Sequence, residues 1–195
     1  MKNNKNSKSE KSFTGKGIFP YKFAFTLLIP LRNIFLSPKK LIERLELKED
    51  FIVLEIGPGP GYFSIKVAQR LTQGKLVLAD IQQEMLDYAK KRIEKRGLKN
   101  VEYKLCDGEK LKFSNEYFDR VFMVTVIGEV VQKEKYIHEI NRILKKGGLL
   151  SISELVGDPD RMNIEELKEL AAIGGLKLQK HFGSKKNYTI NFIKE

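Results

Sequence analysis

Three glycines alternate with two prolines in the segment VLEIGPGPGYFS, which covers residues 53–64. Gly57, Gly59 and Gly61 directly follow a hydrophobic run and precede residues with helical spacing. Glycine allows a tight turn and lets a ligand approach where a Cβ atom would clash, and a following helix presents free N–H groups at its start. Since the turn lies between an expected strand and an expected helix, we interpret it as a cofactor-binding turn.

An acidic residue ends the next hydrophobic run. Asp80 lies 80 − 61 = 19 residues after Gly61, and in a parallel sheet this position lies beside the first βα turn, where a carboxylate can accept hydrogen bonds from both ribose hydroxyls. A simple strand-end cap is the alternative. A dinucleotide-binding turn would need glycine at position 62, where this chain has Tyr62. The tighter turn, with Glu55 just before it, favours a smaller ligand without a pyrophosphate.

Hydrophobic strands and amphipathic helices alternate around these residues. Short runs rich in Val, Ile, Leu and Phe predict buried parallel strands, and apolar residues three or four apart predict the helices between them. This alternation predicts an α/β fold with a doubly wound, mostly parallel seven-stranded sheet and an antiparallel C-terminal edge hairpin. The expected strands are 51–56, 75–80, 101–105, 120–126, 149–154, 177–182 and 188–193, and the expected helices include 38–45, 62–71, 85–93, 137–144 and 164–171.

On these motifs the chain resembles the class I S-adenosylmethionine-dependent methyltransferases, in particular the small type 11 branch that includes ubiquinone and menaquinone biosynthesis C-methyltransferases. The resemblance covers about residues 37–193 and rests on VLEIGPGPG, LADIQQEML, LCDGEKLKFSNEYFDRV and RILKKGGLLSISE. It implies a Rossmann-like methyltransferase fold, S-adenosyl-L-methionine as cofactor, and methyl transfer to a small acceptor molecule, for which the Phe-rich segment 18–36 would form an apolar cavity.

The resemblance also implies roles for the matched residues. Gly57 and Gly59 would contact the methionine and ribose part of the cofactor, while Glu55 shapes the loop. Asp80 would hold the ribose hydroxyls, and Ile81 would lie against the adenine face. The full set of expected cofactor-binding residues is Glu55, Gly57, Pro58, Gly59, Gly61, Asp80, Ile81, Asp107, Gly108 and Thr125.

The last three of these match later motifs. Asp107 and Gly108 match the turn whose carboxylate accepts the adenine amino group, and Thr125 matches the end of the fourth strand near the sulfonium. Two departures stand out: Lys112 occupies a position where the family often has proline, and IGEV (127–130) replaces the His-containing sequence common after that strand. The catalytic assignment therefore does not carry over, and a purely turn-forming Asp107 is the alternative.

Methyl transfer from a sulfonium requires mainly orientation and a water-poor pocket, because the cofactor already carries an activated methyl group. If the acceptor must lose a proton, the candidate catalytic base is Glu129, just beyond the fourth strand; the alternative is a carboxylate that stabilises a helix start. Tyr21 and Phe25 are candidate substrate-pocket residues, with core packing as the alternative. We expect no metal site, because the two histidines and Cys106 have no partners at ligand spacing.

The chain divides into three predicted parts. Residues 1–17 carry five lysines and one glutamate, 5 − 1 = +4, and their polar composition predicts a disordered basic tail. Residues 18–36 are rich in Phe and Leu, and we expect an apolar lid or cap segment over the carboxyl ends of the strands. Residues 37–195 would form the methyltransferase domain.

Composition limits the possible partners and compartment. The single cysteine favours a reducing, cytoplasmic setting and excludes zinc fingers and Cys-x-x-Cys chemistry. Of the net charge of 36 − 25 = +11, +4 lies in residues 1–17 and the remaining 11 − 4 = +7 is spread over expected helix faces, so we expect a small-molecule acceptor and no obligate nucleic acid partner. No transmembrane segment is expected, although weak peripheral membrane contact stays open. The alternatives are a peripheral anionic-membrane or nucleic-acid-binding protein with a degenerate cofactor fold, and a nicotinamide-dependent oxidoreductase.

Overall fold

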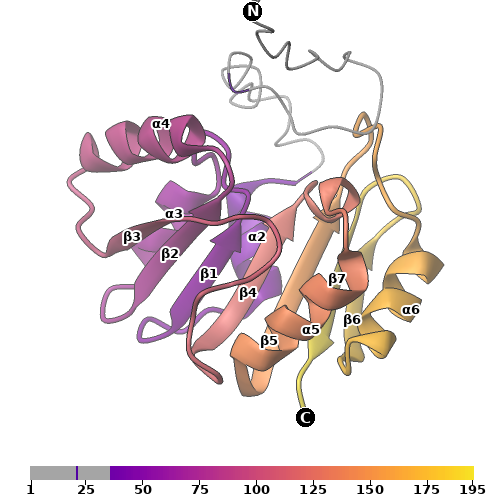
Figure 1. The fold of residues 1–195 in the computed structure, drawn as a ribbon. Helices are drawn as coiled ribbons and strands as arrows, with labels where there is room; N and C mark the ends of the chain where they lie inside the picture. The colour runs from indigo at the N-terminus through magenta and orange to yellow at the C-terminus, as the bar shows by residue number, and fades with distance from the viewer. Residues whose placement is uncertain (1–20, 22–35) are drawn as a thin grey trace, which may run out of the picture.

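The computed structural model describes Tyr21 and residues 36–195. Its centre is a seven-stranded sheet with the strand order β3-β2-β1-β4-β5-β7-β6 (Figure 1). The strands are β1 (Ile52–Ile56), β2 (Lys75–Asp80), β3 (Val101–Leu105), β4 (Phe118–Val124), β5 (Leu144–Glu154), β6 (Lys177–Gly183) and β7 (Tyr188–Ile193). The helices are α2 (Pro38–Leu45), α3 (Ser64–Arg70), α4 (Gln83–Glu94), α5 (Lys133–Ile143) and α6 (Ile164–Ile173), with a short 3-10 helix η2 (Ile127–Glu129).

The first five strands pair in parallel, and β7 runs antiparallel to both β5 and β6. The predicted α/β architecture with an antiparallel C-terminal edge hairpin is therefore confirmed. Within the hairpin, the last strand lies next to β5 and the earlier strand β6 forms the edge. The strand order reverses between β1 and β4, and in such sheets ligands bind at the carboxyl ends of the strands beside this reversal.

Two hydrophobic clusters cover the two faces of the sheet. Helices α5 and α6 pack on one face through buried residues such as Ile137, Ile140 and Leu167. Helices α2, α3 and α4 pack on the other face, where Leu41 and Val67 are fully buried. Because β1 and β2 are covered on both sides, their side chains are apolar almost throughout, as parallel strands require.

The structure places some element boundaries differently from the sequence prediction. The helix expected to run through Leu144 ends at Ile143, and Leu144 begins β5 because it pairs with Phe118 of β4. The N–H of Tyr117 donates to the carbonyl of Ile143 at 2.8 Å. Pairing with β4 therefore places Leu144 in a strand and not in the helix. Helical periodicity alone does not reveal that a neighbouring strand competes for the same residue.

The predicted start of α2 is confirmed, since Ser37 caps it and Pro38 is its first residue. The predicted tail (1–17), Phe25 and most of the predicted lid (18–36) lie outside the described residues. Tyr21 is 44 % exposed, and Leu36 is buried in the α2 side of the core. Within the described ranges, no helix combines the length and apolar character that a membrane crossing would need.

Candidate active site

The glycine turn links the carboxyl end of β1 to α3. The N–H of Gly57 donates to the carbonyl of Ala79 in β2 at 2.8 Å, which holds the turn against the neighbouring strand. Gly57 has φ +64°, and a Cβ atom at this position would lie 2.6 Å from Cγ2 of Val126, just after β4. Only glycine both adopts this positive φ without strain and lacks the Cβ atom that would overlap Val126. The turn closes with a 3.0 Å hydrogen bond from the N–H of Gly61 to the carbonyl of Pro58.

Glu55 is buried beneath this turn. Its side chain accepts a 2.5 Å hydrogen bond at Oε2 from the hydroxyl of Ser64, the first residue of α3. Burial raises the pKa of Glu55 to about 8, the Ser64 bond opposes this shift, and the charge of Asp80 adds to it. The sequence analysis did not select Ser64, although its position just after the turn was a usable signal.

Asp80 ends β2 and is almost completely buried. Burial raises its pKa, while hydrogen bonds from the backbone N–H groups of Gln82, Ile81 and Gly59 lower it. The bond from Gln82 reaches Oδ1 at 3.0 Å. Since the N–H of Gly59 acts on this carboxylate, the structure brings Asp80 and the glycine turn together.

Ile81 and Gly108 face each other beside Asp80. Ile81 is partly exposed, at 39 %, and a Cβ atom on residue 108 would lie 3.4 Å from its Cγ2. Gly108 has φ +81°. Gly108 therefore lies close to the partly exposed apolar side chain of Ile81, just after the carboxyl ends of β3 and β2.

Asp107 is exposed and stabilises its own turn. Its Oδ1 accepts hydrogen bonds from the N–H groups of Glu109 at 3.0 Å and Lys110 at 2.9 Å, and these bonds lower its pKa. Lys112 Nζ lies 3.8 Å from Oδ2. The turn-forming role is therefore present in the structure, whereas the predicted contact with an adenine amino group stays a prediction.

Tyr136 of α5 is a neighbour of this region that the sequence analysis did not select. It is buried, and burial together with the charges of Cys106, Asp80 and Asp107 raises its pKa. The N–H of Cys106 donates to the carbonyl of Asp80 at 2.9 Å. Tyr136 lies within an ordinary amphipathic helix pattern, so its sequence gave no signal of proximity to the acidic residues.

Thr125 has a strained backbone at the end of β4. Its φ of +57° is unusual for a β-branched residue. The N–H of Thr125 donates to Ser153 of β5 at 2.8 Å, and its hydroxyl donates to the carbonyl of Val124 at 2.7 Å. Backbone strain of this kind often accompanies functional positions. Glu129 follows in η2 and is partly buried, and its N–H donates to Val126 at 3.0 Å.

Glu154 is a second buried glutamate, at the carboxyl end of β5. It is 0 % exposed, and neither carboxylate oxygen has a hydrogen-bond partner. Burial and the charges of Asp158 and Glu129 raise its pKa to about 8, while Arg161 opposes the shift. A buried polar group without a partner costs about 1–3 kcal/mol. The sequence analysis missed Glu154, although it ends a buried strand as Asp80 does.

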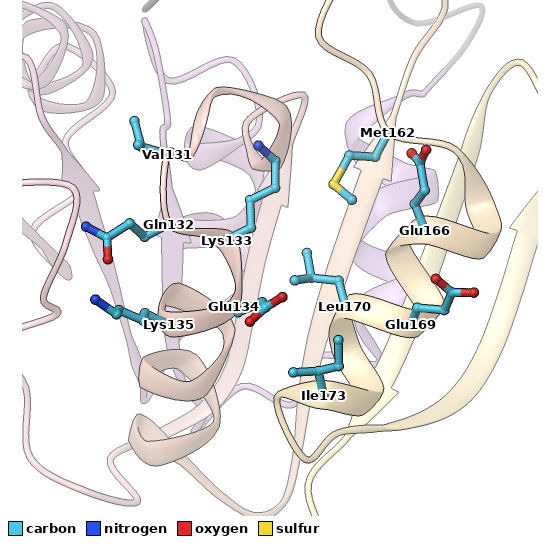
Figure 2. Close-up of a pocket in the computed structure, with 10 residues that line it drawn as sticks. All are labelled: Val131, Gln132, Lys133, Glu134, Lys135, Met162, Glu166, Glu169, Leu170 and Ile173. Atoms are coloured by element: carbon cyan, nitrogen blue, oxygen red, sulfur yellow. The ribbon is translucent and has the colours of Figure 1, made fainter.

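A groove of about 530 Å³ lies between α5 and α6, on one face of the sheet (Figure 2). Val131 and Met162 lie at one end of it and Ile173 at the other. None of the predicted cofactor-binding residues lines this groove. Among the residues that the structure describes, no group of three or more His, Cys, Asp and Glu side chains could hold a metal ion.

Comparisons with known proteins agree with this geometry. The sequence profile of a family described as "Methyltransferase domain" matches residues 47–190. The ubiquinone/menaquinone biosynthesis C-methyltransferase UbiE of Francisella tularensis subsp. novicida is 32 % identical over 118 residues, which are 60 % of this chain and 47 % of that protein. The chain thus spans about half the length of the curated relatives it matches.

Two solved structures share the fold. A SAM-dependent methyltransferase from Aquifex aeolicus is 23 % identical and has a TM-score of 0.85, over 91 % of this chain and 100 % of that one. A TehB-like SAM-dependent methyltransferase from Corynebacterium glutamicum is 17 % identical and has a TM-score of 0.71, over 89 % of this chain and 99 % of that one. At these identities the two structures establish the fold alone.

Proposed function

The chain belongs to the methyltransferase-domain family of class I S-adenosylmethionine-dependent methyltransferases, and from this premise we propose that it transfers a methyl group from S-adenosylmethionine to a small, largely apolar acceptor. One observation carries the proposal: the carboxylate of Asp80 is buried at the end of β2, and the backbone N–H of Gly59 in the glycine turn lies near enough to lower its pKa. This arrangement supports the proposal that Asp80 accepts hydrogen bonds from the ribose hydroxyls of a cofactor held at the glycine turn.

The residues present fit this cofactor. The glycine turn brings the backbone of Gly59 beside Asp80, which supplies the charged hydrogen-bond acceptor. We assign the partly exposed side chain of Ile81, which lies beside Gly108, to the adenine face. When bound, S-adenosylmethionine supplies an activated methyl group on a sulfonium, and the task of the chain is to bind, orient and exclude water.

The other site assignments belong to this proposal. Asp107 has a second carboxylate oxygen, Oδ2, in addition to the one that stabilises its turn, and we assign it to the adenine amino group. We place Thr125 near the sulfonium, because it ends β4 next to the glycine turn. Glu129 is the proposed base for an acceptor that must lose a proton.

The curated relatives suggest the kind of acceptor. They are named as C-methyltransferases of ubiquinone and menaquinone biosynthesis, so we propose methylation of a ring carbon in a quinone-like precursor. We further propose that residues 18–36, with Tyr21 and Phe25, complete the acceptor pocket, and that the reaction takes place in the cytoplasm. Neither the oxidoreductase alternative nor the binding-protein alternative is supported, since the profile and the named relatives are methyltransferases.

Calorimetry with S-adenosylmethionine and S-adenosylhomocysteine tests the cofactor. We expect saturable binding of both without any polyanion, followed by transfer of labelled methyl groups to 1,4-dihydroxynaphthalene or to a component of a metabolite extract. A folded protein that binds neither compound would contradict the proposed function. Binding without transfer to the naphthalene would reject that acceptor and leave the cofactor assignment standing.

A further inference from the structure

We propose that Glu154 binds a hydrogen-bond donor of the methyl acceptor, a hydroxyl or N–H group, and thereby selects neutral acceptors that carry one. This inference rests on the proposed methyl transfer and deepens it, because it names a chemical property that the acceptor must have. It comes from the position of Glu154, from its burial, and from the absence of a partner for its carboxylate.

Glu154 lies on the same edge of the sheet as the glycine turn. It ends β5, which pairs with β4, and β4 pairs with β1. The residue before it, Ser153, accepts the N–H of the strained Thr125 at 2.8 Å. Val126 follows and approaches Gly57 closely. A short run of contacts therefore connects Glu154 to the candidate cofactor turn. Figure 1 shows β5, β4 and β1 lying side by side.

The neighbours of Glu154 are bonded elsewhere. The hydroxyl of Tyr188, the residue paired with Glu154 on β7, donates to the carbonyl of Met162 at 2.6 Å. Arg161 Nη1 donates to the carbonyl of Lys186 at 2.6 Å, and no ion pair joins Arg161 to Glu154. Glu55, by contrast, accepts a hydrogen bond from the hydroxyl of Ser64. The protein thus satisfies one of its two strand-end glutamates internally and leaves the other to an outside donor.

Two segments follow the carboxyl ends of β4 and β5, and their Glu129, Asp158 and Arg161 act electrostatically on Glu154. The segments are η2 and residues 155–163, and they touch where Gly128 packs on the carbonyl oxygen of Asp160; a Cβ atom at residue 128 would overlap it. Ile127 and Leu155 are buried within these segments. An acceptor that separates the two segments meets apolar side chains and one polar group, a combination that suits a small apolar molecule with a single hydrogen-bond donor.

The charged residues around Glu154 restrict the charge that the acceptor can carry. Glu129 and Asp158 both act on Glu154 as negative charges. An anionic acceptor would be repelled by these groups, whereas a neutral hydroxyl or N–H group would provide the missing hydrogen bond. A neutral donor is therefore the expected ligand chemistry.

The test compares two probes that differ only in the donor, 1-naphthol and 1-methoxynaphthalene. Each is titrated by calorimetry into the full chain saturated with S-adenosylhomocysteine, using wild type, Glu154→Met and Glu154→Gln. Methionine has similar length and no acceptor, and glutamine keeps the shape if the methionine variant does not fold. The matched control is Ser151→Ala, which removes another buried, unpartnered polar group from the same strand.

We expect wild type and Ser151→Ala to bind 1-naphthol about tenfold more tightly than its methyl ether, because the bound ether leaves the buried carboxyl group without a hydrogen bond. Glu154→Met should lose this preference while its affinity for S-adenosylhomocysteine stays within about twofold, and Glu154→Gln should reduce it. Equal binding of both probes to wild type, no binding of either, or an intact preference in Glu154→Met would overturn the inference. No binding of S-adenosylhomocysteine to wild type would instead overturn the proposed function.

Thermal melting separates ligand recognition from a structural role. If Glu154 is retained for a ligand, an apolar replacement removes an unpaired buried group, and Glu154→Met should melt above wild type at pH 8. If the carboxylate has a structural function, the same variant should melt below wild type. That lower melting temperature would count against the inference.

Discussion

The hydroxyl of Ser64 donates a 2.5 Å hydrogen bond to Oε2 of Glu55 directly beneath the glycine turn. This contact joins the last part of β1 to the first residue of α3, and it compensates part of the cost of burying the carboxyl group. The rigidity of the candidate cofactor site thus depends on a pair of which only Glu55 was among the predicted cofactor-binding residues.

Replacement of Ser64 by alanine should destabilise the protein. The change leaves a buried carboxyl without its donor, so we expect the free energy of unfolding to fall by about 1–3 kcal/mol. Urea denaturation measures this value. Ser151→Ala is the control, since the Ser151 hydroxyl is buried but has no partner to lose, and it should change stability by much less. Equal effects of the two substitutions would contradict the role assigned to the Ser64–Glu55 bond.

Asp80→Ala should weaken S-adenosylmethionine binding by about 10- to 100-fold, because it removes a charged acceptor of hydrogen bonds from the ribose. The measurement is calorimetric titration at one fixed ionic strength. Asp87→Ala on the exposed face of α4 is the matched control and should bind the cofactor as wild type does. Unchanged affinity in a folded Asp80→Ala protein would remove the ribose assignment.

Gly57→Ala and Gly97→Ala together distinguish the cost of a positive φ from the cost of a steric overlap at the Cβ position. Both positions have positive φ, +64° and +70°, but a Cβ atom meets Val126 at residue 57 and nothing within 4 Å at residue 97. Gly97→Ala should therefore cost only the backbone term of about 1 kcal/mol, while Gly57→Ala should cost more and also reduce cofactor affinity. Denaturation and calorimetry on both variants check this order, and the reverse order would show that the turn accommodates a side chain.

Stability should decrease as the pH rises from about 5 to 8. Burial raises the pKa of Glu55 and of Glu154 from 4.5 to about 8, so the folded state holds these protons more tightly than the unfolded state. Their contribution is complete below pH 4.5 and is lost as the pH approaches 8. Each group contributes a slope of up to about 1.4 kcal/mol per pH unit.

Urea denaturation at several pH values measures this slope. Glu154→Gln should reduce it by about the contribution of one group, and Glu43→Gln on the exposed face of α2 should leave it unchanged. A wild-type stability that is constant between pH 5 and 8 would contradict the raised pKa values.

The amino-acid sequence alone determined the order and type of the elements. Hydrophobic periodicity is a local property, and it indicated every strand of the sheet, the helices between them and the edge hairpin. The glycine turn and Asp80 were equally readable, because a positive φ at Gly57 and an acid at a strand end each require particular residue types. The motif resemblance led to the family that the profile comparison supports.

Only the tertiary structure decided which polar groups are satisfied. Leu144 lies in β5 because Phe118, distant in sequence, offers it a strand partner. Asp107 stabilises its own turn, Glu55 is paired with Ser64, and Glu154 has no partner. Burial and hydrogen bonding depend on neighbours that the chain brings together only on folding, so two glutamates at strand ends look alike in sequence and differ in the folded protein.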